Sequence, residues 1–97
     1  MKVIWSPRAI DRAHEEARFI AADKPEAALR WLDRIFVATG RLESFPESGQ
    51  IVPEIGLANY RQIIYRSHRI IYRIEATRIS ILTIRRSKRM LDPTELQ

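Results

Sequence analysis

Two stretches in the first half of the chain repeat apolar residues at the spacing of an amphipathic helix. The first begins after Ser6-Pro7, a pair suited to the cap and the first position of a helix. Its apolar stripe comprises Ile10, Ala13, Ala17 and Ile20, and its remaining positions include Arg12, Glu15, Glu16 and Arg18. The second begins at Pro25, with a stripe of Ala28, Leu32, Ile35, Thr39 and Leu42. Residues 23–26 end the first helix and start the second. Because this connection is so short, we expect an antiparallel helical hairpin that ends before Pro46.

The second half of the chain has the composition and alternation of β-strands. Three segments rich in Ile, Tyr and Thr are separated by two-residue turns, Ser67-His68 and Ala76-Thr77, and they span 60–66, 69–75 and 78–85. In the middle segment one face carries Ile70, Tyr72 and Ile74, and the other carries Arg69, Ile71 and Arg73. The last segment is apolar on both faces, which predicts a central position in a sheet and leaves its orientation open.

Two shorter pieces complete the expected fold. Residues 2–5 are an apolar run that predicts an N-terminal strand, and residues 50–52 are a candidate extended piece within the loop 46–59. The chain is therefore assigned to the α+β class, with an N-terminal strand, an antiparallel helical hairpin and a three-stranded antiparallel meander. We expect a single domain over residues 1–97, with one sheet four strands wide and the helices packed on one face.

The composition excludes several classes of protein. The chain has no cysteine, which rules out disulfides and thiolate metal sites, and with only His14 and His68 as imidazoles we expect neither a metal site nor a cofactor. No apolar run approaches the roughly 18–20 residues of a transmembrane helix. The apolar stretch at the N-terminus is too short for a secretory signal and is interrupted by Pro7, so we expect a soluble cytoplasmic protein.

The net charge of +5 comes from the second half of the chain. Residues 1–48 have as many acidic as basic side chains, whereas within residues 60–90 all nine basic side chains are accompanied by one carboxylate, Glu75. Most of the cations are arginines, which bind carboxylates and phosphates through two parallel hydrogen bonds. We therefore expect the C-terminal half to meet an anionic partner, the alternative being a solvated basic face.

The order of the elements and a series of short fragments resemble the RelE/ParE superfamily of toxins from type II toxin–antitoxin systems. The fragments extend over nearly the whole chain and comprise Ser6-Pro7-Arg8-Ala9, Pro25-Glu26-Ala27-Ala28, and the segments 45–50, 60–64, 65–75 and 81–89. The segment 49–54, the pair Tyr60-Arg61 and the basic stretch after the last strand are similar to the ParE branch. Many ParE-like chains have a histidine before the arginine pair, and Arg85 or its neighbour occupies that place here.

The resemblance implies one of two activities. RelE-like toxins cut mRNA in the ribosomal A site, and on that interpretation the catalytic candidates are Arg61, Arg69, Arg85 and Lys88. Such cleavage also needs a proton acceptor, but no His or Tyr follows Tyr72, and His68 falls in a predicted turn, where a structural role is commoner. ParE-like toxins inhibit DNA gyrase, which requires a complementary surface and no general base. The candidates for binding the target are Arg61, Arg85, Arg86, Lys88 and Arg89, and we favour gyrase and a non-enzymatic role.

The resemblance also implies an antitoxin with an acidic segment that folds on its toxin. We expect it to lay an amphipathic helix along the hairpin and an extended segment beside the sheet, with its carboxylates on Arg66, Arg73 and Arg78. A plain nucleic-acid-binding module, with affinity that falls steeply with salt, is a third interpretation. Arg61 could equally grip an anion or pair with a carboxylate of the helices. Three aromatic residues are expected in the core, namely Trp5, Trp31 and Tyr72.

Overall fold

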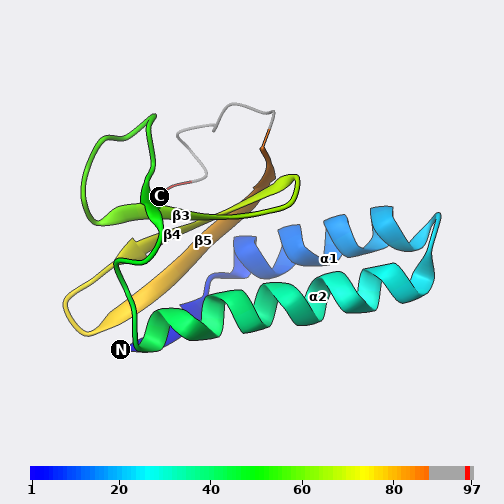
Figure 1. Ribbon diagram of the computed structural model, residues 1–97, viewed down its shortest axis with the longest axis horizontal. Coiled ribbons are helices and arrows are strands. Elements are labelled where there is room, and N and C mark those ends of the chain that lie inside the picture. The colour runs from blue at the N-terminus through cyan, green and yellow to red at the C-terminus, as the bar shows by residue number, and fades with distance from the viewer. Residues whose placement is uncertain (88–95, 97) are drawn as a thin grey trace.

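The computed structural model describes residues 1–87 and 96, and it shows one sheet with two helices on one of its faces (Figure 1). The elements are β1 (Lys2–Trp5), α1 (Pro7–Ala21), α2 (Pro25–Gly40), the 3₁₀ helix η1 (Arg41–Glu43), β2 (Gln50–Ile51), β3 (Tyr60–Tyr65), β4 (His68–Ile74) and β5 (Arg78–Arg86). The predicted α+β class, with its helical hairpin and C-terminal meander, is confirmed. No helix within the described residues has the length and apolar character that crossing a bilayer requires.

The sheet differs from the prediction in two details. Its strand order is β1-β5-β4-β3-β2, with five strands and not four, because β2 pairs with β3. It is mixed, because β1 runs parallel to β5, with Val3 opposite Ile79, while the other neighbouring pairs are antiparallel. β5 has a neighbour on both sides, so the central position predicted from its apolar residues is confirmed.

Helix α1 is attached to β5 through its N-cap. The Ser6 hydroxyl accepts a hydrogen bond from the Ala9 N–H at 3.1 Å and donates one to the Leu82 carbonyl at 3.0 Å. The buried face of the helix comprises Ala9, Ala13, Glu16 and Ala17. The predicted stripe was wrong at Ile10, which is 43% exposed, because the helix turns its alanines toward β5 and α2.

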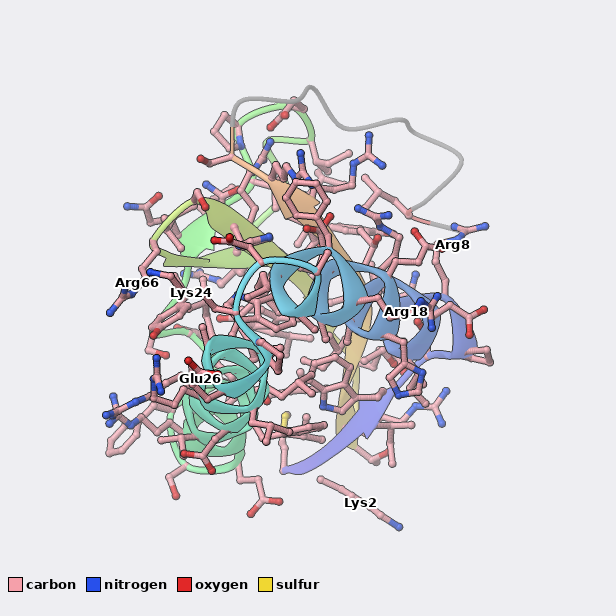
Figure 2. The ribbon with its side chains drawn as sticks, turned by 90° about the vertical axis from the view of Figure 1, so that its right-hand side faces the viewer. Lys2, Arg8, Arg18, Lys24, Glu26 and Arg66 are labelled. Atoms are coloured by element: carbon pink, nitrogen blue, oxygen red, sulfur yellow. The ribbon has the colours of Figure 1, made fainter. Side chains whose placement is uncertain are left out.

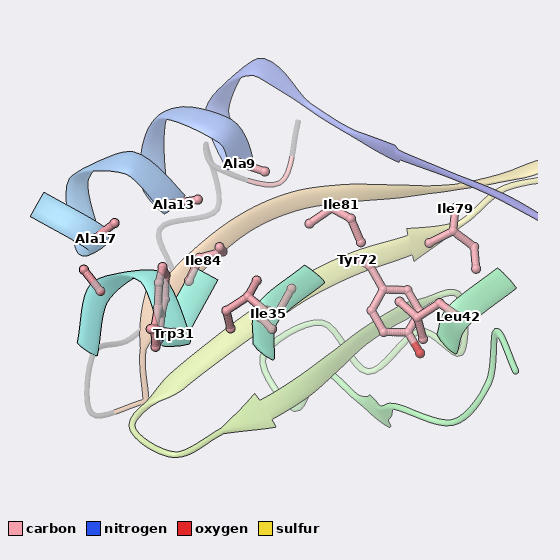
Figure 3. Packing of buried hydrophobic residues seen from close by; sticks show 12 residues of the cluster. Ala9, Ala13, Ala17, Trp31, Ile35, Leu42, Tyr72, Ile79, Ile81 and Ile84 are labelled. Atoms are coloured by element: carbon pink, nitrogen blue, oxygen red, sulfur yellow. The ribbon is translucent and has the colours of Figure 1, made fainter. Parts of the chain in front are cut away.

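The main core lies between the helices and the sheet (Figure 3). From the helices it takes the alanines of α1 together with Ala28, Trp31 and Ile35 of α2, and from the sheet it takes Ile70, Tyr72, Ile79, Ile81 and Ile84. Helix α2 ends at Gly40, and η1 continues the chain so that Leu42 is also buried. Trp31 and Tyr72 are buried and Trp5 packs against the core half-buried, which confirms the placement expected for these aromatic residues.

A β-bulge in β5 explains why this strand is apolar on both faces. Ile71 lies opposite Thr83 and Tyr72 lies opposite Ile81, so Leu82 is an extra residue in the ladder. The extra residue shifts the alternation, and Ile81 and Ile84 both belong to the core under the helices. Leu82 packs instead on the far face, by which we mean the face of the sheet opposite the helices, in a second cluster with Val52, Ile71 and Leu96.

The turn between β3 and β4 consists of Arg66 and Ser67, and the predicted turn of Ser67 and His68 was wrong. Tyr65 and His68 form the last pair of the ladder, which makes His68 the first residue of β4, where it is 7% exposed. Arg66 has a φ of 53°, in the left-handed region that residues with a bulky side chain seldom adopt. The turn has neither the glycine nor the asparagine that usually marks such a conformation, which is why its position could not be read from the local sequence.

Candidate binding surfaces

A buried carboxylate of α1 joins three basic side chains. Glu16 is 5% exposed, and its Oε2 lies 3.0 Å from Nε2 of His68 and 3.4 Å from Nε of Arg86, while its Oε1 accepts a hydrogen bond from Arg12 at 3.1 Å. Burial raises the pKa of Glu16, but the hydrogen bond with His68 and the charges of Arg86 and Arg12 outweigh burial and hold that pKa below its usual value. This Glu16 cluster ties α1 to the adjoining ends of β4 and β5.

The Glu16 cluster was not predicted from the sequence, because Glu16 lies outside the apolar stripe that was expected for this helix. The available signal was the spacing of Glu16 from two small residues. Glu16 follows Ala9 by seven positions and Ala13 by three, so it shares their face of the helix. A carboxylate on the buried face of a helix needs cationic partners, and two of these, His68 and Arg86, come from other elements.

A cavity of about 510 Å³ lies between α1, α2 and the β3–β4 turn, beside the Glu16 cluster. We call it the α2 cavity. Its apolar lining includes Phe19, Ile20, Trp31 and Tyr65, and its cationic lining consists of Arg30, Arg34, Arg66 and Arg86. The Arg86 guanidinium stacks 4.1 Å from the ring centroid of Phe19, and that of Arg66 lies 5.7 Å from the ring centroid of Tyr65. The cavity therefore combines apolar walls with an arginine-rich margin.

On the far face of the sheet, Arg69 is buried and paired. Its two terminal nitrogens donate to both carboxylate oxygens of Glu54 at 2.7 and 2.8 Å, and its Nε donates to Oε1 of Gln62 at 2.8 Å. Arg85 lies opposite Arg69 in the β4–β5 ladder and is half-buried. Since Glu54 belongs to the loop before β3, the chain itself supplies the anion that neutralises Arg69.

Arg73 and Arg78, two of the arginines predicted to meet the antitoxin, share Glu75. The Glu75 carboxylate accepts hydrogen bonds from Arg73 Nη2 at 2.7 Å, from Arg78 Nε at 2.6 Å and from the Ser80 hydroxyl at 2.9 Å. The hydrogen bonds from Arg78 and Arg73 lower the pKa of Glu75 to about 2. This trio therefore has one positive charge in excess, and not two.

Within the described residues, Arg61 forms no ion pair with a carboxylate of the helices, and its binding of an anion from a partner stays a prediction. It donates hydrogen bonds to three backbone carbonyls, those of Ala58, Glu47 and Gly49, at 2.8, 3.1 and 3.0 Å. Nearby, the Tyr72 hydroxyl donates to the Pro46 carbonyl at 2.7 Å and accepts from the Gly49 N–H at 3.0 Å. Burial raises the pKa of Tyr72, so its phenol stays a donor at neutral pH. Arg61 and Tyr72 together hold the segment before β2 against the sheet, and Arg61 also contacts the end of the loop before β3.

The candidate arginines do not form one continuous patch. Arg86 lines the α2 cavity, Arg69 lies on the far face and Arg61 holds a loop. Arg85 precedes Arg86 on the same strand, and successive side chains of a strand point to opposite faces. The remaining candidates, Lys88 and Arg89, lie outside the described residues.

Carboxylates from outside the sequence window 60–90 reach two of the basic residues of the meander. Glu54 reaches Arg69 from the loop, and Glu16 reaches Arg86 from α1. Both acids lie outside the sequence window 60–90 in which the charges were counted, and only the folded chain brings them to these arginines. Charge in a window of sequence therefore overestimates the free charge of this surface.

Comparison with known proteins shows how the fold relates to solved structures. The chain is similar to the chromosomal ParDE TA system from P. aeruginosa, with a TM-score of 0.74, 21% sequence identity, and coverage of 91% of this chain and 97% of that chain. It is also similar to the toxin-antitoxin complex RelBE2 from Mycobacterium tuberculosis, with a TM-score of 0.56, 17% identity, and coverage of 88% and 95%. At these identities the likeness shows a shared fold.

The family assignment comes from the sequence. A comparison with curated proteins found no match. Residues 3–91, however, match the family described as the ParE toxin of the type II toxin-antitoxin system parDE. Because that match spans almost the whole chain, including both helices and nearly all of the sheet, the chain belongs to the ParE toxin family of type II toxin–antitoxin systems.

Proposed function

We propose that this protein inhibits DNA gyrase and that a cognate antitoxin holds it inactive. The match to the ParE toxin family over residues 3–91 is the observation that carries the proposal. Inhibition by binding requires a complementary surface, and the described residues offer exposed arginines beside exposed apolar side chains. It does not require a general base or a metal ion.

The surroundings of the nuclease candidates support inhibition by binding and not cleavage of RNA. Arg69 is engaged with Glu54 and Gln62, so little of its guanidinium is left to bind a phosphate. Arg61 donates to backbone carbonyls through Nε and Nη1, which leaves only its Nη2 for such a contact. The imidazole of His68 is buried, and its Nε2 lies against Glu16. Metal-free cleavage needs a group that reaches the proton of a 2′-hydroxyl, and the Nε2 of His68 is already engaged by Glu16.

The direct test applies the purified protein to a gyrase supercoiling assay and to a translating extract in parallel. We expect supercoiling to be lost while the mRNA in the extract stays intact. The product of the adjacent gene, as the expected antitoxin, should restore supercoiling when added in equimolar amount. Cleaved mRNA together with unaffected supercoiling would contradict the proposal and would favour a ribosome-dependent nuclease.

We further propose that the antitoxin lies along the helical hairpin and beside the sheet. The hairpin exposes Phe19, Leu29, Phe36 and Val37, which an amphipathic helix of the partner could cover. The two similar solved structures are of a ParDE TA system and a RelBE2 toxin-antitoxin complex, and these support a partner of the same kind.

Of the three arginines proposed to contact the antitoxin, Arg66 is the best candidate. It has no carboxylate partner within the described residues, whereas Arg73 and Arg78 share Glu75. We expect Arg66→Glu to weaken copurification with the product of the adjacent gene more than Arg73→Glu or Arg78→Glu does. Unchanged affinity of all three variants at low salt would contradict the proposed contact.

A further inference from the structure

The α2 cavity is surrounded by arginines whose charge the chain leaves uncompensated. Arg30 and Arg34 lie one helical turn apart on α2, and both are exposed, as is Arg66 on the β3–β4 turn. Within residues 1–87 and 96, none of the three forms an ion pair with a carboxylate. Arg86 differs from them, since Glu16 lies 3.4 Å from its Nε. Three free guanidinium groups at the margin of one cavity constitute a strong local attraction for anions.

Part of the wall of the same cavity is apolar, and Glu16 and His68, which are paired with each other, also line it. Phe19 is 64% exposed, an unusual state for a phenylalanine unless something covers it, and Ile20, Trp31 and Tyr65 continue the apolar surface. The volume of about 510 Å³ is enough for one or two large side chains. A ligand matched to this site therefore has an apolar part that enters and negative groups that stay at the margin.

We propose that the α2 cavity is a docking site for an acidic peptide segment. An apolar side chain of the segment enters the cavity beside Phe19, and carboxylates on either side of it pair with Arg30, Arg34 and Arg66. The inference rests on the proposed function in that the antitoxin would supply this segment. It places the charged contact on α2 and the β3–β4 turn, away from the Glu75 trio.

The aromatic residues of the cavity favour a peptide over a nucleic acid. A base would have to stack on an open ring face, and the Arg86 guanidinium at 4.1 Å from the Phe19 ring centroid and that of Arg66 at 5.7 Å from the Tyr65 ring centroid each compete with a base for one face of these rings. Carboxylates need no ring face, since they bind the edge of a guanidinium through two parallel hydrogen bonds. The same side of α2 continues past Arg34 to Val37, which is 47% exposed, so an elongated segment has further apolar surface to cover.

The test is a titration of the ¹⁵N-labelled full-length protein, followed by NMR in about 0.15 M salt, an ionic strength that screens weak long-range attraction. The probes are the peptide EELEEFEELEE, its uncharged counterpart QQLQQFQQLQQ and an oligouridylate RNA of matched negative charge. We expect the acidic peptide to shift the backbone signals around Phe19, Arg34 and Ser67. The uncharged peptide should bind with an affinity at least about tenfold lower.

Two variants address the site and one serves as a matched control. Arg30→Glu/Arg34→Glu reverses two charges at the margin, and Ala27→Trp fills the cavity without changing the charge. The control, Lys2→Glu/Arg18→Glu, makes the same change in net charge at exposed residues that do not line the cavity; Figure 2 shows Arg18 and Arg66 on opposite sides of this end of the molecule. We expect each cavity variant to lose about tenfold in affinity and the control to lose less than about threefold.

Three results would overturn the inference: equal binding by the cavity variants and the control, shifts centred on the far face of the sheet, or tighter binding of the RNA with the same sensitivity to Arg30→Glu/Arg34→Glu.

The proposed function can fail independently of the docking site. If the acidic peptide binds the cavity but the protein leaves gyrase unaffected, the docking site stands and gyrase inhibition falls. If the product of the adjacent gene neutralises wild type and Arg30→Glu/Arg34→Glu equally well, the toxin assignment stands and the docking site falls.

Discussion

The arginines of the far face and those of the α2 cavity have the same chemistry, but the chain treats them differently. On the far face, Arg69 is buried against Glu54, and Arg73 and Arg78 share Glu75. At the cavity, Arg30 and Arg34 project from α2 without a carboxylate partner within the described residues. The far face thus uses its arginines to hold the fold together, whereas the cavity leaves its arginines available to another molecule.

The contrast between Arg69 and the pair Arg30 and Arg34 shows that burial, and not the count of cations, decides whether an arginine must have a partner in this protein. A charge that is removed from water must be paired, so the burial of Arg69 depends on its hydrogen bonds with Glu54 and Gln62. An exposed arginine has no such requirement, and its free energy depends little on its neighbours. Substitutions that remove one partner should therefore cost stability on the far face and in the Glu16 cluster, and should cost little at the margin of the cavity.

The largest effect is expected for the carboxylate at the base of the cavity. Glu16→Ala leaves His68, Arg12 and Arg86 without their shared anion, and we expect the free energy of unfolding to fall by roughly 3 kcal/mol. The control is Glu15→Ala, because Glu15 also pairs with Arg12 but at an exposed position, where a loss of about 0.5 kcal/mol or less is expected. Urea denaturation measures both variants, and equal losses would contradict the role given to burial.

The next effect concerns the segment just before β2, which Tyr72 holds by hydrogen bonds to Pro46 and Gly49. A Cβ at Gly49 would lie 2.6 Å from the Gln62 carbonyl oxygen and 2.6 Å from the Tyr72 hydroxyl, so Gly49→Ala should displace this segment and cost about 2 kcal/mol. The control is Gly40→Ala at the end of α2, where a Cβ meets nothing within 4 Å and helix propensity should raise stability by up to about 1 kcal/mol. Thermal unfolding of both variants checks the opposite signs.

A smaller effect separates the two groups of arginines directly. Arg69→Met leaves the Glu54 carboxylate and the Gln62 amide without their partner, and we expect a loss of about 1–2 kcal/mol. The same substitution at the cavity, Arg34→Met, should change stability by no more than about 0.5 kcal/mol. Chemical denaturation of Arg69→Met and Arg34→Met measures the free energy of unfolding of each variant. A larger loss for Arg34→Met would contradict the difference proposed between the two groups of arginines.

The smallest effect is a dependence on acidity. The pKa of Glu75 is about 2 in the folded protein because Arg78 and Arg73 donate to it, and this lies below its ordinary value of 4.5. The ion pairs therefore stabilise the fold fully above pH 4.5, and this contribution is lost as the pH falls toward 2. Stability measured between pH 5 and about 2.5 should fall less steeply for Glu75→Gln than for wild type. Parallel curves would show that Glu75 does not contribute.

Local patterns were enough to predict the elements and most of the core. Ser6-Pro7 and Pro25 mark the helix starts, and the meander follows from segments rich in β-branched residues, because capping and periodicity depend on neighbours in sequence. The family could also be recognised at this level, since its fragments retain their order along the chain. The candidate site could be predicted only as a list of arginines.

What the tertiary structure decided is the partner of each arginine. His68 lies 52 positions from Glu16, and Arg69 lies 15 positions from Glu54, so no sequence pattern of a single helix or strand could bring these groups together. The bulge at Leu82 and the left-handed conformation of Arg66 likewise depend on how β4 is paired. The sequence alone determined how many charges the protein has and in which elements they lie; the packing of distant elements determined which are neutralised, because ion pairing depends on distance in space.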